Sequence, residues 1–440
     1  MKALYKITTI LAVILLIGFA MPASALAPEH EITAQSVILI DAQTGQLLYG
    51  RDMHLQLYPA SITKIMTGLL AMENYSPNKI PVVSESAMDF MSESSHIALT
   101  PGEEIPMDSL MYALMLPSAN DAANVIAEHI AGNQEAFARM MTERVMEIGA
   151  FNTNFTNAHG LPDDGRHYTT AYDMALITRE AIRNPAFLHY FGTRRQTIPA
   201  TNKQPEERNF TNQNFMLLPD QRWAYYTYAI GGKVGFTGAA RHTISSAAYR
   251  DGRTLIAVVM GCGHDERFHY TRELFEFGFE SFTLISLEDT VLTPAPVPLM
   301  YGDMVIGEAT FFLPDEKLTM LVPNGIGEEA LVYSHNLPDY MQKDEPVTAS
   351  VSITVNGAPG VMLDIPLTKH ITVWEYAPTF TALSGDTNRQ EAVRDGDFYL
   401  LWIIPILIAM AALFVYVDAL KRKRARIRRM RNRRTGRWMS

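Results

Sequence analysis

The spacing of hydrophobic and polar positions predicts a mixed α and β domain in the larger, N-terminal part of the chain. Apolar residues recur with the period of an α-helix over 61–73, 107–116, 122–131, 134–148 and 172–182. Apolar runs bounded by turn residues predict strands over 36–50, 228–236 and 242–260, with turns at 41–45 and at Asp251-Gly252. Strands, a helical block and returning strands favour an α/β (α+β) domain over 28–285, in which helices cover an antiparallel sheet.

A second pattern begins at residue 289, where short apolar segments are separated by Gly, Pro, Asn and Asp. It predicts a small all-β, sandwich-like domain over 289–380. Residues 381–397 are polar and lack a periodic apolar face, so we expect a stalk there.

Both ends of the chain carry membrane signals. Lys2 and Lys6 precede an apolar run and the small residues Ala23-Ser24-Ala25, which predicts a signal peptide over 1–25. The alternative, an uncleaved anchor, fits less well because a spanning helix needs about 20 apolar residues. The uncharged segment 398–417 predicts a transmembrane helix, and the basic tail 418–440 then lies in the cytoplasm.

The net charge of −10 averages two different regions, because 11 of the 37 basic residues lie between Lys421 and Arg437. Residues 28–397 hold 24 basic and 46 acidic side chains, a net charge near −22. Such a surface repels phosphates, so we expect no nucleic-acid partner. We therefore predict a single-pass protein of the cell membrane whose acidic middle part is outside the cytoplasm. The only cysteine, Cys262, cannot form an intramolecular disulfide.

Ser61 and Lys64 open one of the predicted helices, directly after Pro59, which is well tolerated in a first turn. Their spacing of three places a hydroxyl and an amine side by side. Serine becomes a good nucleophile when a base takes its proton, and lysine can be that base where burial or a second cation lowers its pKa. The helix N-terminus also favours the negative charge that develops on an attacked carbonyl. The pattern indicates nucleophilic catalysis.

Two further motifs could complete such a site. Ser118-Ala119-Asn120 lies between two predicted helices, so its polar side chains project from a turn, and the alternative is that Ser118 caps the next helix. Lys233-Val234-Gly235 lies on a glycine-flanked strand, where a ligand can approach the backbone closely and a lysine can meet a carboxylate.

Together the three motifs resemble those of the penicillin-recognising serine enzymes, S-x-x-K, S-D-N and K-T-G, in the same order. The segments YPASITKIMTGLLAMEN, MLPSANDAANVIAEHIAG and TNFTNAHGLPDDGRHYTTAYDMALI are similar to the low-molecular-mass D-alanyl-D-alanine carboxypeptidases. The resemblance covers most of residues 30–380, including the β domain. It implies a penicillin-recognising serine hydrolase domain, followed by the all-β domain and one C-terminal transmembrane helix.

The resemblance also implies roles for individual residues. Ser61 would be the acylated nucleophile, Lys64 its general base and Ser118 a proton relay to the leaving amine. Asn120 would bind the substrate amide, and Lys233, beside Gly235 on the substrate-binding strand, would hold the terminal carboxylate. The backbone N–H groups of Ser61 and Phe236 would form the oxyanion hole.

This chain departs from the family pattern at two places. Val234 replaces a Thr or Ser, and losing one hydrogen bond to a charged carboxylate costs about 1.5–3 kcal/mol, roughly a 10- to 150-fold effect. We therefore expect Val234→Thr to raise turnover, unless Thr237 supplies a substitute hydroxyl. Arg241 stands in Ala240-Arg241-His242, where relatives usually have Ala-Gly-Tyr. It is either a new carboxylate ligand or a solvated charge at a strand entrance.

The sequence thus predicts a serine-type carboxypeptidase that removes the terminal D-alanine from peptidoglycan stem peptides and is inhibited by β-lactams. We expect no cofactor and no metal, because His264, Asp265 and His269 follow a strand as a polar loop. Two alternatives stay open. One is a weakly active or inactive homologue that binds peptidoglycan as a scaffold, and the other is a β-lactamase or D-specific endopeptidase that uses the same serine.

Overall fold

The fold was analysed on a computed structural model, which describes residues 27–74, 79–88, 94–287, 294–314, 318–342, 348–356 and 358–373. The predicted signal peptide (1–25), stalk (381–397), transmembrane helix (398–417) and basic tail (418–440) lie outside these residues. Within the described part of the chain, no helix combines the length and the apolar character needed to cross a membrane.

An antiparallel sheet of eight strands forms the centre of the described structure. Its strand order is β12-β14-β15-β2-β1-β7-β6-β5. The strands are β1 (Ser36–Asp41), β2 (Leu47–Arg51), β5 (Ala229–Thr237), β6 (Arg241–Arg250), β7 (Arg253–Cys262), β12 (Leu331–Asn336), β14 (Ser350–Val355) and β15 (Ala358–Pro366). Strand β5 is therefore an edge strand, and the backbone groups on its outer side are not paired within this sheet.

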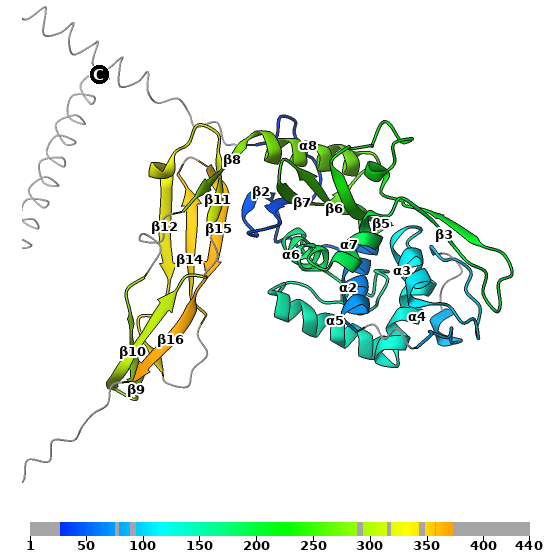
Figure 1. Ribbon diagram of the computed structural model, residues 1–440, viewed down its shortest axis with the longest axis horizontal. Coiled ribbons are helices and arrows are strands. Elements are labelled where there is room, and N and C mark those ends of the chain that lie inside the picture. Colours follow the sequence, from blue (N-terminus) through cyan, green and yellow to red (C-terminus); the bar gives the residue numbers. More distant parts are fainter. Residues whose placement is uncertain are drawn as a thin grey trace, which may run out of the picture. The chain divides into compact units, whose positions relative to one another are not determined.

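Helices cover both faces of the strands β1, β5, β6 and β7. Helix α8 packs on β6 and β7 from one side, whereas α6 packs on β1 and β7 from the other (Figure 1). The helices are α2 (Lys64–Asn74), α3 (Met107–Met115), α4 (Asn120–Ala131), α5 (Gln134–Ile148), α6 (Ala171–Ile182), α7 (Pro185–Gly192) and α8 (Glu266–Glu280). Short 3-10 turns are η1 (Ala60–Thr63), η2 (Ser86–Met88), η3 (Phe215–Leu217) and η4 (Glu328–Ala330).

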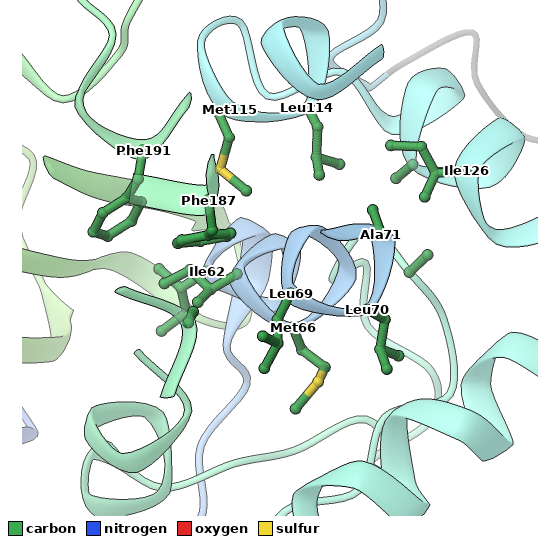
Figure 2. Close-up of a cluster of buried hydrophobic side chains, with 14 of the residues drawn as sticks. Ile62, Met66, Leu69, Leu70, Ala71, Leu114, Met115, Ile126, Phe187 and Phe191 are labelled. Atoms are coloured by element: carbon green, nitrogen blue, oxygen red, sulfur yellow. The ribbon is translucent and has the colours of Figure 1, made fainter. Parts of the chain in front are cut away.

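Helix α2 passes through the middle of the helical layer. Residues 64–71 of this helix are all buried, including the polar residues Lys64 and Thr67. Figure 2 shows the apolar side chains of α2 among those of α3, α4 and α7: Met66, Leu69, Leu70, Ala71, Leu114, Met115, Ile126, Phe187 and Phe191. Close packing on every side fixes the N-terminal end of α2, where the candidate nucleophile lies.

The strands after residue 286 divide among three sheets. Strands β12, β14 and β15 extend the eight-stranded sheet, and β15 meets β2 at Met362 and Leu47. A separate sheet has the order β13-β9-β10-β16, formed by Met341–Gln342, Val297–Tyr301, Met304–Phe312 and Thr368–Val373. Two small ladders pair β8 (Phe282–Ser286) with β11 (Thr319–Pro323) and β3 (Arg195–Ile198) with β4 (Arg208–Thr211). The domain boundaries given by the sequence stay predictions.

Several predicted elements differ in detail from the observed ones. The helix predicted from residue 61 begins at Lys64, because Ser61 lies in the preceding 3-10 turn. The segment after Cys262 was expected to be a loop, but α8 begins there at Glu266. Four of its phenylalanines are buried. The apolar residues of α8 come from a sequence that also holds many charged residues, so its helical period is weak.

Candidate active site

Ser61 and Lys64 lie at the junction of the 3-10 turn η1 and helix α2. The turn starts from Pro59, and Ala60 has a φ of +51°, in the left-handed region. This tight entry places Lys64 Nζ 3.1 Å from Ser61 Oγ. The hydroxyl and the amine are therefore in direct hydrogen-bond contact, as the spacing of three predicted.

Lys64 Nζ has two more hydrogen-bond partners, both of which can only accept. It donates to Asn120 Oδ1 at 2.6 Å and to the backbone carbonyl of His159 at 2.9 Å. In a neutral amine these two contacts use both N–H bonds, so the remaining lone pair points at Ser61 Oγ. The geometry therefore selects Ser61 as the group from which Lys64 can take a proton.

The environment of Lys64 also favours its neutral form. Complete burial lowers the pKa of Lys64 well below 10.5, and the positive charge of Lys233 lowers it further, whereas Asp121 opposes the shift. Asp121 is itself buried at the start of α4, where it accepts backbone N–H groups of Ile97 and Leu99. These are the conditions under which a lysine can act as a base.

Ser118 lies in the turn between α3 and α4, two residues before Asn120. Its φ of +66° is unusual for a residue with a side chain, and such strain often marks functional positions. Its Oγ is buried and has no hydrogen-bond partner among the described residues. Ser118 does not cap α4, since the N-cap position is Ala119 and has no side-chain hydrogen bond. The hydroxyl is thus left available for a ligand or a water molecule.

Strand β5 brings Lys233 and Gly235 to the same side of the sheet, because alternate strand residues share a face. A Cβ atom added at Gly235 would lie only 2.7 Å from the backbone nitrogen of Ser61, so this strand approaches the nucleophile closely. Lys233 is buried and donates to the carbonyl of Val234 at 3.0 Å. Burial and the neighbouring Arg267 lower the pKa of Lys233 to about 7.

The remaining predicted residues lie where β5 turns into β6. Thr237 pairs with Arg241, and Thr237 Oγ1 accepts the N–H of Ala240 at 3.0 Å, which leaves its own proton free to be donated. Arg241 has a φ of +57° and donates to the carbonyl of Gly261 at 3.0 Å. The side chain of Phe236 is 59% exposed and stacks on His242.

Val234 contributes to the apolar cluster between the sheet and α8. It is only 3% exposed, and Ile244 lies directly opposite on β6. Lys233 and Gly235 therefore lie on one face of the sheet, and Val234 packs on the opposite face.

Two functional contacts escaped sequence reasoning because they form only in three dimensions. The carbonyl of His159 holds Lys64 from a loop in which Asn157 Oδ1 accepts the N–H of Gly160 at 2.7 Å. Arg267 of α8 is buried, and it donates to Gly235 O at 3.5 Å and contacts His242 Nδ1 at 3.1 Å. A buried arginine beside the strand that carries Lys233 is a second candidate for binding a carboxylate. The only sign of Arg267 in the sequence is that a charged residue stands where the helical pattern of α8 would place an apolar one.

An activated serine between a helical layer and the edge of an antiparallel sheet defines the class of penicillin-recognising serine hydrolases. The solved structure of penicillin-binding protein 5 from Haemophilus influenzae has this fold. It superposes with a TM-score of 0.59 at 25% identity, covering 78% of this chain and 99% of that one. A D-alanyl-D-alanine carboxypeptidase structure from Mycobacterium tuberculosis covers 59% of this chain and 95% of its own, at 32% identity and a TM-score of 0.53.

The sequence profile of peptidase family S11, described as D-alanyl-D-alanine carboxypeptidase, matches residues 22–263. The carboxypeptidase DacF of Bacillus subtilis is 32% identical over 323 residues, which are 71% of this chain and 80% of DacF. The chain therefore belongs to the D-alanyl-D-alanine carboxypeptidase family and is a serine peptidase, as the three motifs predicted.

Proposed function

We propose that the protein removes the terminal D-alanine from peptidoglycan stem peptides through an acyl-enzyme on Ser61. Lys64 in its neutral form takes the proton of Ser61 Oγ as that oxygen attacks the penultimate carbonyl carbon. The oxyanion that forms meets the backbone N–H groups of Ser61 and Phe236. Ser118 passes a proton to the leaving D-alanine amine, and water then releases the shortened peptide. A β-lactam acylates the same serine and leaves slowly.

Substrate binding uses the groups around this centre. Asn120 donates its amide N–H to the carbonyl of the penultimate residue while its Oδ1 accepts from Lys64. Lys233, Arg267 and the Thr237 hydroxyl form a donor-rich end of the site for the terminal carboxylate. Arg241 is tied to Gly261, so we assign it to shaping the hairpin beside that end.

The observation that carries the proposal is the contact between Lys64 Nζ and Ser61 Oγ at 3.1 Å, with both other partners of Lys64 being acceptors. The test is intact-mass analysis of the soluble 26–397 fragment with penicillin, together with D-alanine release from a pentapeptide ending in D-Ala-D-Ala. We expect a stoichiometric adduct and D-alanine release.

The Ser61→Ala variant is the matched control and should give neither signal. An adduct on that variant would show that another residue is the nucleophile. An adduct on the unmodified fragment without D-alanine release would favour a β-lactamase or an endopeptidase. A folded fragment that gives neither signal would favour a peptidoglycan-binding scaffold.

We also propose that the catalytic part lies outside the cytoplasm, held at the cell membrane by the C-terminal segment 398–417. The apolar segments at both ends and the basic tail support this placement. Fractionation of cells that express the full chain tests it. The protein should sediment with membranes and be digested by a protease added outside the cell, whereas a chain truncated after residue 397 should be released.

A further inference from the structure

The hairpin of β9 and β10 ends in exposed apolar side chains that have no part in the mechanism above. Tyr301 and Met304 pair on either side of a two-residue turn, and they are 63% and 64% exposed. Val305, next along β10, and Val373, at the end of the neighbouring strand β16, are also exposed (Figure 1). These four residues are called the hairpin tip below.

Three residues of the hairpin tip lie on the face of the sheet that forms the small apolar core of this part. Leu299, which is buried in that core, and Tyr301 lie two positions apart on β9 and share a face. Gly307 of β10 pairs with Leu299 on one side and with Val373 on the other. Directly opposed residues share a face, so Val373 and Met304, which pairs with Tyr301, continue the same face. The apolar face of the sheet thus extends past its own core.

The hairpin is also nearly free of charge. Asp303, in the turn, is the only charged residue of the sequence 297–307, whereas residues 28–397 hold 24 basic and 46 acidic side chains. A contact made by the hairpin tip is therefore driven by burial of apolar surface and not by ion pairs. Four side chains are too few for a stable protein interface, which buries at least about 1,000 Å².

The course of the chain indicates what covers the hairpin tip. Val373 ends β16 and is the last residue that the structure describes. Only 24 residues separate it from the uncharged segment 398–417, and they can span at most about 85 Å. Trp374 and Tyr376 follow Val373 directly in the sequence, and both residue types are enriched where a protein meets the membrane surface. The hairpin tip therefore lies where the described chain continues toward the predicted transmembrane helix.

We propose that the hairpin tip binds the lipid surface of the membrane, with Tyr301, Met304 and Val373 inserted between the lipids. The inference rests on the proposed placement of the protein at the cell membrane. The ring of Tyr301 is buried among acyl chains while its hydroxyl stays in the headgroup layer, a position that suits this side chain. Asp303 stays in the same polar layer. The β-rich part then has a second, non-covalent attachment to the membrane, in addition to the C-terminal segment.

The test uses the full-length protein in vesicles of phosphatidylethanolamine and phosphatidylglycerol. Met304→Cys is labelled with the polarity-sensitive dye NBD, and Cys262, which is 1% exposed, should take up no label in the unmodified chain. The NBD emission should shift to shorter wavelength, and lipids that carry a nitroxide near the headgroup end of the acyl chain should quench it. Added salt should change neither signal, because an apolar contact is not screened. Loss of both signals in salt would overturn the inference.

Val332→Cys, labelled in the same way, is the matched control, because Val332 is 51% exposed on β12 and lies outside the hairpin tip. Its emission should stay that of a dye in water and should not be quenched. If the label at 304 behaves like the label at 332, the inference fails while the placement at the membrane stands. A shift at 304 without quenching would mean that protein, such as a second copy of this chain, covers the tip, and would also overturn it. If the full-length chain does not float with the vesicles in a density gradient, the proposed placement itself fails, and this inference fails with it.

Discussion

At the scale of single residues, two buried lysines of this site need opposite protonation states. Lys64 must be neutral to accept the proton of Ser61, whereas Lys233 must be charged to hold a carboxylate. Burial and then the charge of Lys233 lower the pKa of Lys64, and burial together with the charge of Arg267 lowers the pKa of Lys233 to about 7. Catalysis therefore depends on a pH window in which only one of the two lysines carries a proton.

This arrangement predicts a bell-shaped pH profile for the second-order rate constant of acylation by penicillin. The rate should rise with pH as Lys64 loses its proton, and fall above a pH of about 7 as Lys233 loses its own. Lys233→Arg should lower the maximum but remove the alkaline fall, because arginine stays charged in this range. Stopped-flow acylation between pH 5 and pH 10 measures both limbs. An alkaline fall that persists in Lys233→Arg would assign it to another group.

Val234 gives a prediction about stability. The side chain packs in an apolar cluster opposite Ile244, so the hydroxyl of Val234→Thr would enter a site with few polar partners. Thermal unfolding should show a free energy of unfolding lower by about 1–3 kcal/mol. Val332→Thr is the control, because Val332 is exposed and should tolerate the same change. The same Val234→Thr protein tests the expectation from sequence that turnover rises, and an unchanged melting temperature would show that the hydroxyl finds a partner.

At the scale of elements, the loop before α6 fixes the catalytic helix through buried histidines. His167 Nε2 lies 2.9 Å from Thr63 Oγ1, and its Nδ1 accepts the N–H of Thr156, so the ring is a neutral bridge between η1 and the loop. Burial lowers the pKa of both His159 and His167 to about 3. Both rings resist protonation in the folded protein.

The folded state should therefore lose stability in mild acid. Below pH 6.5 the unfolded chain binds protons on both histidines and the folded chain does not, so the free energy of unfolding falls until the pH nears about 3. Each group contributes a slope of about 1.4 kcal/mol per pH unit. His167→Gln can keep both hydrogen bonds. It should reduce the dependence of the free energy of unfolding on pH by about 1.4 kcal/mol per pH unit, the contribution of one histidine. Melting temperatures between pH 4 and pH 7 measure it, and an unchanged slope would mean that other groups dominate acid unfolding.

Elements with a clear apolar period were predictable from the sequence, and those whose burial comes from tertiary packing were not. Helices α3, α4, α5 and α6 lie close to their predicted ranges because apolar residues recur along each with the period of a helix. The contact of Ser61 with Lys64 also followed from spacing alone. Helix α8, which is rich in aromatic residues, and the carbonyl of His159 did not. Their partners are distant in sequence, and no local pattern records a contact of that kind.

At the scale of the whole molecule, the β-rich part is joined to the catalytic part by paired strands, by a shared apolar cluster and by the buried side chain of Gln46. The side chain of Gln46 donates to Leu321 O at 2.6 Å and accepts from Leu321 N at 2.7 Å, while β8 pairs with β11. Every residue placed in the catalytic centre nevertheless precedes residue 287.

These observations predict that the fragment 27–287 is still acylated by penicillin but unfolds at a lower temperature. Without β11, the amide of Gln46 loses both partners, and Phe277 and Phe282 lose apolar neighbours of the same cluster. The melting temperature should therefore fall relative to the 27–373 chain. The second-order rate constant of acylation by penicillin, measured on the folded fraction at a temperature below both transitions, should agree within about twofold. Because every residue assigned to the site precedes residue 287, a folded fragment that is not acylated would show that the β-rich part shapes the active site from outside.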